Sequence, residues 1–186
     1  MCGIFGYIGT KKNATQVVFD GLKRLDYRGY DSWGIGILHE SKIRVQKHAG
    51  KIGEGALNLP ASTIAVGHTR WATHGAVSNT NAHPHFSTDS SFIVAQNGIV
   101  ENYLELKKEL LKKNYVFHTQ TDTEVIVRLI EEKLTQTKNL IQAVRSAFVE
   151  LEGRNTIIIL TKEGQIIAAR NGSPLVIGTN DSEIYF

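Results

Sequence analysis

The sequence has few cysteines, which are typical of disulfide-bonded secreted proteins, and few prolines, which are typical of disordered chains. Among 186 residues there is one cysteine, so no intramolecular disulfide can form, and there are three prolines. No run of about 18 apolar residues could span a membrane, and the N-terminus lacks the basic and apolar segments of a signal peptide. We therefore expect a cytoplasmic globular domain, with no membrane association, that builds a core without disulfides.

Charge and short motifs exclude several function classes. The 21 basic residues barely exceed the 18 acidic ones, and they are scattered without interleaved aromatic residues, so we expect no nucleic-acid partner. There is no P-loop, G-x-S-x-G elbow, C-x-x-C or H-E-x-x-H motif, and Gly34-x-Gly36 lacks a third glycine. The histidines His68, His74, His83 and His85 could ligate a metal in principle. Without a third fixed ligand and supporting residues, we expect them to form hydrogen bonds instead, and we expect neither metal nor cofactor.

Hydrophobic periodicity indicates an α+β chain with antiparallel sheets packed under helices. A capping box, Thr121 with Glu124, is expected to open the central helix. A polar loop from Arg70 to Ser90 is long enough to suggest a functional role. The sequence predicts strands at 2–9, 33–39, 42–48, 64–68, 91–97, 156–160, 165–169, 175–177 and 183–186, and helices at 13–25, 102–113, 121–136 and 138–151.

The single cysteine stands directly after the initiator methionine. Removal of Met1 would leave a thiol and a free α-amine on Cys2, and such an amine can act as the base that activates its own side chain. Because the reference pKa values of the amine and thiol are about 8 and 8.5, that proton transfer costs little near neutral pH. On this feature alone, Cys2 is better explained as an ordinary small apolar residue.

Further motifs resemble the glutaminase domain of class II glutamine amidotransferases, in particular that of the glutamine:fructose-6-phosphate aminotransferases (glucosamine-6-phosphate synthases). The resemblance runs in order from residue 2 to about residue 178. Two residues depart from the family pattern, Trp33 beside Asp-Ser and Gln96 before Asn-Gly, and Arg154-Asn155 departs after Gly153. The matching blocks are Cys2-Gly-Ile, Leu25-Asp-Tyr-Arg-Gly-Tyr-Asp-Ser32, Gly67-His-Thr-Arg-Trp-Ala-Thr-His-Gly75, Asn81-Ala-His-Pro-His85, Asn97-Gly-Ile-Val-Glu-Asn102, Thr121-Asp-Thr-Glu124 and Gly172-Ser-Pro-Leu175.

This resemblance implies the N-terminal nucleophile (Ntn) hydrolase fold, a four-layer αββα sandwich, and hydrolysis of L-glutamine to glutamate and ammonia through a Cys2 thioester. It implies that 1–186 is a glutaminase domain, truncated at its C-terminus and without the sugar isomerase domain. Fructose 6-phosphate would then be a partner only where that domain is present. The implied roles are catalysis for Cys2, Asn97 and Gly98; substrate binding for Arg70, Trp71, Thr73, His74 and Asp122; and support for Arg28, Gly29 and His83.

The residues by themselves leave other interpretations open. Asn97-Gly98 is also the strongest short signal for a type I′ hairpin turn. Asp122 could complement a helix dipole, Arg70 could be a solvated loop charge, and Trp71 could be a packing anchor. A helix C-terminus with glycine at C′ would explain Arg28-Gly29.

The function also has alternatives. The chain could be a catalytically silent glutaminase-like module that binds a partner or regulates a synthase. A third interpretation is an amidotransferase of purine or asparagine synthesis.

Overall fold

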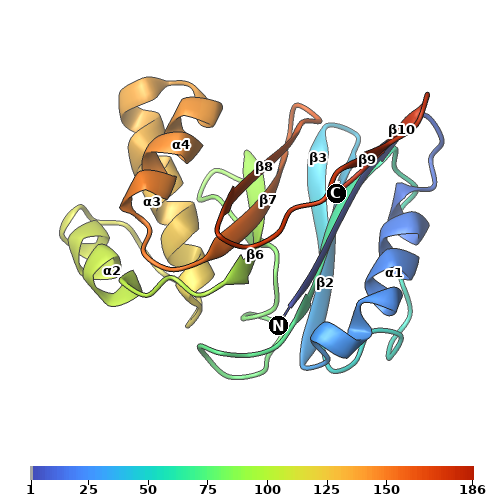
Figure 1. Ribbon diagram of the computed structural model, residues 1–186, viewed down its shortest axis with the longest axis horizontal. Coiled ribbons are helices and arrows are strands. Elements are labelled where there is room, and N and C mark those ends of the chain that lie inside the picture. The colour runs from blue at the N-terminus through green and yellow to red at the C-terminus, as the bar shows by residue number, and fades with distance from the viewer. Residues whose placement is uncertain (1) are drawn as a thin grey trace.

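A computed structural model describes residues 2–186 as two facing β-sheets covered by helices on their outer sides. One helix, α1, covers the outer face of the larger sheet, and α2, α3 and α4 lie beyond the smaller sheet (Figure 1). The layers are therefore helix, sheet, sheet, helix, which confirms the α+β sandwich with antiparallel sheets. No helix within 2–186 is long and apolar enough to cross a membrane.

The larger sheet has six strands in the order β3-β2-β4-β1-β10-β9, and all its pairings are antiparallel. The β2–β3 hairpin predicted from alternation is present. The glycine-rich N-terminal segment becomes a central strand, with Gly3 paired with Thr69. Its elements are β1 (Gly3–Gly9), β2 (Ser32–His39), β3 (Lys42–Ala49), β4 (Ile64–Arg70), β9 (Gly178–Thr179) and β10 (Glu183–Tyr185), with α1 (Ala14–Arg24) and a short 3-10 turn, η1 (Asp26–Arg28), between β1 and β2.

The smaller sheet has the order β5-β6-β7-β8 and is also antiparallel. The second strand, β6, runs through the middle and ends at the Asn97-Gly98 pair. Helices α3 and α4 pack on each other over this sheet, and α2 packs on α3. The elements are β5 (His85–Phe86), β6 (Phe92–Gly98), β7 (Asn155–Thr161), β8 (Ile166–Asn171), α2 (Tyr103–Lys112), α3 (Asp122–Thr137) and α4 (Leu140–Glu150).

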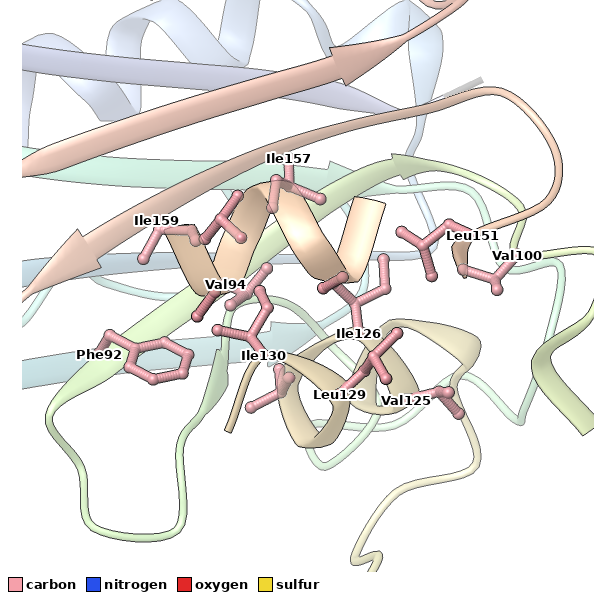
Figure 2. Packing of buried hydrophobic residues seen from close by; sticks show 14 of the residues in the cluster. Phe92, Val94, Val100, Val125, Ile126, Leu129, Ile130, Leu151, Ile157 and Ile159 are labelled. Atoms are coloured by element: carbon pink, nitrogen blue, oxygen red, sulfur yellow. The ribbon is translucent and has the colours of Figure 1, made fainter. Parts of the chain in front are cut away.

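Apolar residues on alternate strand positions and on helix faces form the core. Between the smaller sheet and α3–α4, Figure 2 shows Val94, Ile157 and Ile159 from the strands facing Ile126 and Ile130 from α3. A second cluster lies between α1 and the larger sheet, and a third lies between the two sheets. These three clusters fix the spacing of all four layers.

Two local predictions were wrong. Residues 175–177 are not a strand; the next strand is the two-residue β9. Thr121 occupies the N-cap of α3 without a side-chain capping bond. Its presumed partner in the capping box, Glu124, accepts hydrogen bonds from the backbone N–H groups of His118 and Thr119 and pairs with Arg128 at 3.0 Å. The incoming loop and the next helical turn thus hold this carboxylate.

Trp33 does not crowd the space between the sheets. Its side chain is fully buried on the α1 side of β2, where it packs edge-on against Phe19 with ring centroids 5.7 Å apart. Ile35 and Ile37 share this face, as period-2 alternation requires. The bulk of Trp33 therefore belongs to the core under α1.

Candidate active site

Cys2 lies at the start of β1, beside the end of β4. Because Gly3 pairs with Thr69, the Cys2 side chain lies next to Trp71, and its Sγ is 3.3 Å from the Trp71 backbone nitrogen. Burial raises the pKa of the thiol, while the Trp71 N–H and the positive charge of Arg70 oppose that rise. Met1 lies outside the described residues.

Asn97 and Gly98 reach Cys2 from the other sheet. The Asn97 side-chain Nδ2 donates to the Cys2 carbonyl oxygen at 3.0 Å. Gly98 has a φ of 149°, which L side chains rarely adopt, and a Cβ there would overlap the Arg154 carbonyl oxygen. The pair ends strand β6 and stays in register with β7, so it does not form the two-residue hairpin turn.

A cavity of about 430 Å³ opens beside the thiol. Two larger cavities, of about 500 and 650 Å³, contain no cysteine. A fourth, of about 420 Å³, shares Cys2 and Asn97 but is lined largely by apolar residues near the C-terminus. The cavity beside the thiol brings together five of the predicted site residues with three others: Cys2, Trp71, Thr73, Asn97, Gly98, Ile99, Glu101 and Arg154.

Arg70 is the last residue of β4, and only 3% of its surface is exposed. Its guanidinium donates to the carbonyl oxygens of His74, Gly75 and Ala76, the last at 3.3 Å. Arg70 is therefore a buried anchor of the loop after β4, not a solvated loop charge. Trp71, which begins this loop, is 46% exposed and lies 5.7 Å from the Tyr30 ring.

Asp122 is the first residue of α3 and is 4% exposed. Its Oδ2 accepts a hydrogen bond from the Val100 backbone N–H at 2.9 Å, and its Oδ1 lies 4.0 Å from His74 Nδ1. The carboxylate therefore links α3 to the segment after Gly98 and to the loop after β4. Thr73 lies beside His74, with its Oγ1 3.4 Å from the imidazole.

The structure corrects the interpretation of Arg28-Gly29 as a helix end with glycine at C′. Gly29 has φ −172° and ψ 124°, an extended conformation that any residue adopts. It is glycine because a Cβ would lie 2.7 Å from the Arg70 carbonyl carbon and 2.9 Å from the Trp71 nitrogen. Arg28 lines the apolar cavity that shares Cys2. The close approach at Gly29 therefore packs η1 against the strand end beside the thiol.

His83 lies behind the site and lines neither cavity that contains Cys2. It is buried, stacks on His68 with ring centroids 4.2 Å apart, and its Nε2 is 3.1 Å from the Thr123 hydroxyl. His85 pairs similarly with Thr121. Hydrogen bonds to Thr123 on α3 and to its N-cap residue Thr121 thus account for the two histidines of the His83-Pro-His85 motif.

Sequence reasoning missed the residues that hold the loop after β4. Asp31 accepts a hydrogen bond from the Ala72 N–H at 2.8 Å. Asn81 and Gln120 exchange amide hydrogen bonds at 3.0 and 3.1 Å, and Gln120 also accepts from the Ala76 N–H. Asp31 and Asn81 stand inside the matched motif blocks, whereas Gln120 directly precedes one and carries no signal of its own.

Comparisons with known proteins agree with this geometry. A family model for the glutamine amidotransferase domain matches residues 1–149. The isomerizing glutamine–fructose-6-phosphate aminotransferase of Pyrococcus horikoshii is 48% identical over all of this chain, and that of Bacteroides thetaiotaomicron is 46% identical. The chain covers 32% and 31% of these two relatives, so it spans about a third of their length.

Solved structures give the same fold. The glutamine phosphoribosylpyrophosphate amidotransferase of B. subtilis superposes with a TM-score of 0.87 at 28% identity, over all of this chain and 41% of that one. A structure titled as the allosteric regulatory enzyme of purine biosynthesis gives 0.88 at 29% identity. The matched family model and the shared Ntn-type architecture lead to one conclusion: the chain belongs to the glutamine amidotransferase domain family.

Proposed function

We propose that this domain hydrolyses L-glutamine to glutamate and ammonia, and that residues 1–186 form the glutaminase part of a longer glutamine:fructose-6-phosphate aminotransferase. The observation that carries this proposal is the Asn97 amide, 3.0 Å from the Cys2 backbone, in a chain whose one thiol lines a cavity. The greater identity to the fructose-6-phosphate enzymes, 48% against 28%, favours this branch over the phosphoribosylpyrophosphate one.

The proposed reaction begins with the thiol of Cys2. Once Met1 is removed, the Cys2 α-amine takes the thiol proton, and the thiolate attacks the carbon of the substrate carboxamide. The C–N bond then breaks, the amine returns its proton to the leaving ammonia, and a thioester remains. Water hydrolyses the thioester to glutamate and restores the thiol.

Charge develops on the carboxamide oxygen in each tetrahedral intermediate. The Asn97 side-chain amide and the Gly98 backbone N–H are adjacent donors on a rigid strand end, which is the arrangement that stabilises such an oxyanion. The positive φ of Gly98 orients its peptide. In the structure, the Asn97 amide donates to the Cys2 carbonyl, so it lies beside the residue that it would serve.

The two charges of the amino acid need partners of opposite sign. We assign the α-carboxylate to Arg70 and the α-ammonium to Asp122, because both are buried charges that contact His74 of the loop after β4: Arg70 donates to its carbonyl oxygen, and Asp122 Oδ1 lies 4.0 Å from its Nδ1. Arginine suits a carboxylate because its planar fork binds it in a bidentate manner. Thr73, His74 and Trp71 would then form the wall of loop residues over the substrate.

The test is glutamate production by the full chain, with an intact-mass measurement that reports Met1 removal. Wild-type protein should release glutamate and ammonia in equal amounts, Cys2→Ala should release neither, and Asn97→Ala should lower kcat by ~10² to 10³ with KM nearly unchanged. Wild-type protein that lacks Met1 and releases no glutamate would favour the silent-module alternative.

We also propose that the domain works in the cytoplasm. The chain relies on a free thiol and has no second cysteine with which to protect it in a disulfide. A reducing compartment keeps such a thiol available. A tagged protein that fractionates outside the cytoplasm would contradict this assignment.

A further inference from the structure

Gln96 is a buried polar residue directly before the two proposed oxyanion donors. It lies on β6, and 2% of its surface is exposed. Its side chain accepts a hydrogen bond from the Thr123 hydroxyl and donates one from Nε2 to Asn155 Oδ1 at 2.6 Å. Both ends of this amide are therefore satisfied by side chains from other elements, α3 and β7.

Asn155 lies directly beside Gly98 on the neighbouring strand. The two residues are partners in the β6–β7 register, and a Cβ added to Gly98 would stand 2.7 Å from Asn155 Oδ1. Asn155 is itself fully buried. The hydrogen bond from Gln96 therefore fixes the Asn155 side chain, which lies against the Gly98 backbone.

The backbone of Gln96 is held as firmly as its side chain. Its carbonyl oxygen accepts a hydrogen bond from His68 Nε2 at 2.8 Å, and its N–H donates to His83 Nδ1 at 3.4 Å. Because His83 Nδ1 accepts, its Nε2 carries the proton and donates to the Thr123 hydroxyl at 3.1 Å. The bonds then run in one direction, from His83 through Thr123 and Gln96 to Asn155.

This chain of hydrogen bonds connects the two halves of the proposed site. Thr123 follows Asp122, the proposed partner of the α-ammonium, and Gln96 precedes Asn97 in the sequence. A buried polar network fixes a geometry only when all its members are satisfied, and each side-chain amide and hydroxyl here has a partner. Loss of one member would leave buried polar atoms unpaired and release the strand end.

We propose that Gln96 and Asn155 are positioning residues that hold the Asn97 amide and the Gly98 N–H in line with the oxyanion. The inference rests on the proposed glutaminase function and deepens it. Neither side chain lines the cavity beside Cys2, so both act through the donors that they hold. A misplacement of about 1 Å at such donors costs up to ~10²-fold in rate.

The test uses Gln96→Met and Asn155→Leu, which keep side-chain volume and remove the pair, alone and combined, in the full chain. Each single variant should lower kcat for glutamine about 10- to 100-fold and leave KM within about threefold. The kcat of the double variant should be no lower than that of the worse single variant, because the two residues act as one unit. Thr123→Val removes the hydroxyl's bonds to His83 and Gln96 and leaves the Gln96–Asn155 bond in place, so it provides a second variant should either substitution prevent folding.

Two controls separate positioning from general damage. Alkylation of Cys2 by iodoacetamide forms no oxyanion, so its rate should be unchanged in both variants. Thr161→Val removes a buried hydroxyl from the end of β7 opposite Asn155, where Thr161 pairs with Phe92. This substitution should lower the melting temperature without lowering kcat.

Each remaining outcome identifies which idea fails. Unchanged kcat in both single variants, a change in KM alone, additive effects in the double variant, or an equal loss in Thr161→Val would overturn the positioning role while wild-type activity supports the function. Wild-type protein lacking Met1 that releases no glutamate would overturn the proposed function and this inference with it.

Discussion

Three buried histidines make the stability of this fold depend on pH. His68, His83 and His85 are 0%, 5% and 3% exposed and lie in one group behind the candidate active site, with His68 stacked on His83 and His83 edge-on to His85. Burial lowers the pKa of His68 to about 3, and burial together with nearby positive charges lowers the pKa values of His83 and His85 well below the usual range. Those charges are the other two imidazoles, when protonated, and the side chains of Lys47, Arg70 and Arg128.

The sign and size of the effect follow from proton linkage. In the unfolded chain a histidine binds a proton below about pH 6.5, whereas these three stay neutral in the folded chain, so stability rises with pH through this range. At pH 5 each histidine that stays neutral costs about 2 kcal/mol, and the three together cost about 6 kcal/mol. That loss is comparable with the whole stability of a typical domain, about 5 to 15 kcal/mol.

The measurement is urea unfolding of the full chain at pH 7, 6 and 5. Carboxylates with lowered pKa values, such as Glu124, lose their contribution only below about pH 4.5, so this window isolates the histidines. His85→Gln can keep a hydrogen bond to Thr121 and cannot titrate, so it should remove about a third of the pH dependence. His39→Gln, on the partly exposed end of the β2–β3 hairpin, replaces a histidine outside this buried group and serves as the control. Equal stability at pH 7 and pH 5 would refute the argument.

Three further predictions concern the site. Arg70→Lys should raise KM for glutamine and loosen the loop after β4, because lysine lacks the fork with which the guanidinium bonds three loop carbonyls. Steady-state kinetics would measure KM and limited proteolysis would measure the loosening of the loop. A wild-type KM together with a wild-type proteolysis rate would contradict this prediction. Asp122→Asn should weaken discrimination against analogues without the α-amine, measured as a ratio of kcat/KM values, and an unchanged ratio would move the ammonium site elsewhere. Gly29→Ala should destabilise the domain by about 1 to 3 kcal/mol in thermal unfolding, because the added Cβ would meet only backbone atoms, which cannot move aside easily. Gly178→Ala is the control and should be neutral, because the nearest neighbour of its Cβ is 4.0 Å away. Equal effects of the two substitutions would refute the packing argument.

The elements with strong periodicity could be predicted from the sequence, and the weaker ones could not. Alternation predicted the hairpin at 33–48, and apolar spacing predicted the helices that became α3 and α4. The capping box at Thr121 failed because Glu124 found other partners, including a buried arginine four residues on. The error at 175–177 has a similar origin: short apolar runs carry no period that separates strand from loop.

Site residues that belong to short sequence motifs could be predicted, whereas those that act through contacts distant in the sequence could not. Cys2 and the Asn97-Gly98 pair are recognisable as short motifs, and the structure places them together although they lie 95 residues apart. The supporting residues are a different case. Gln120 and Asn155 act through side-chain amides that contact residues 39 and 59 positions away, and distant contacts of that kind leave no pattern in one sequence.

The division of the site between two sheets explains why its supporting network is built from buried polar residues. Cys2 and Trp71 directly adjoin strands β1 and β4 of the larger sheet, and Asn97 and Gly98 end strand β6 of the smaller one. The apolar cluster between the sheets fixes their distance, but apolar contacts are not directional and tolerate small sliding. The hydrogen bond from His68 on β4 to the Gln96 carbonyl oxygen on β6 opposes that sliding because its geometry is strict. The same burial that makes this bond effective at neutral pH lowers the pKa of His68, so protonation of the imidazole in acid works against the folded state.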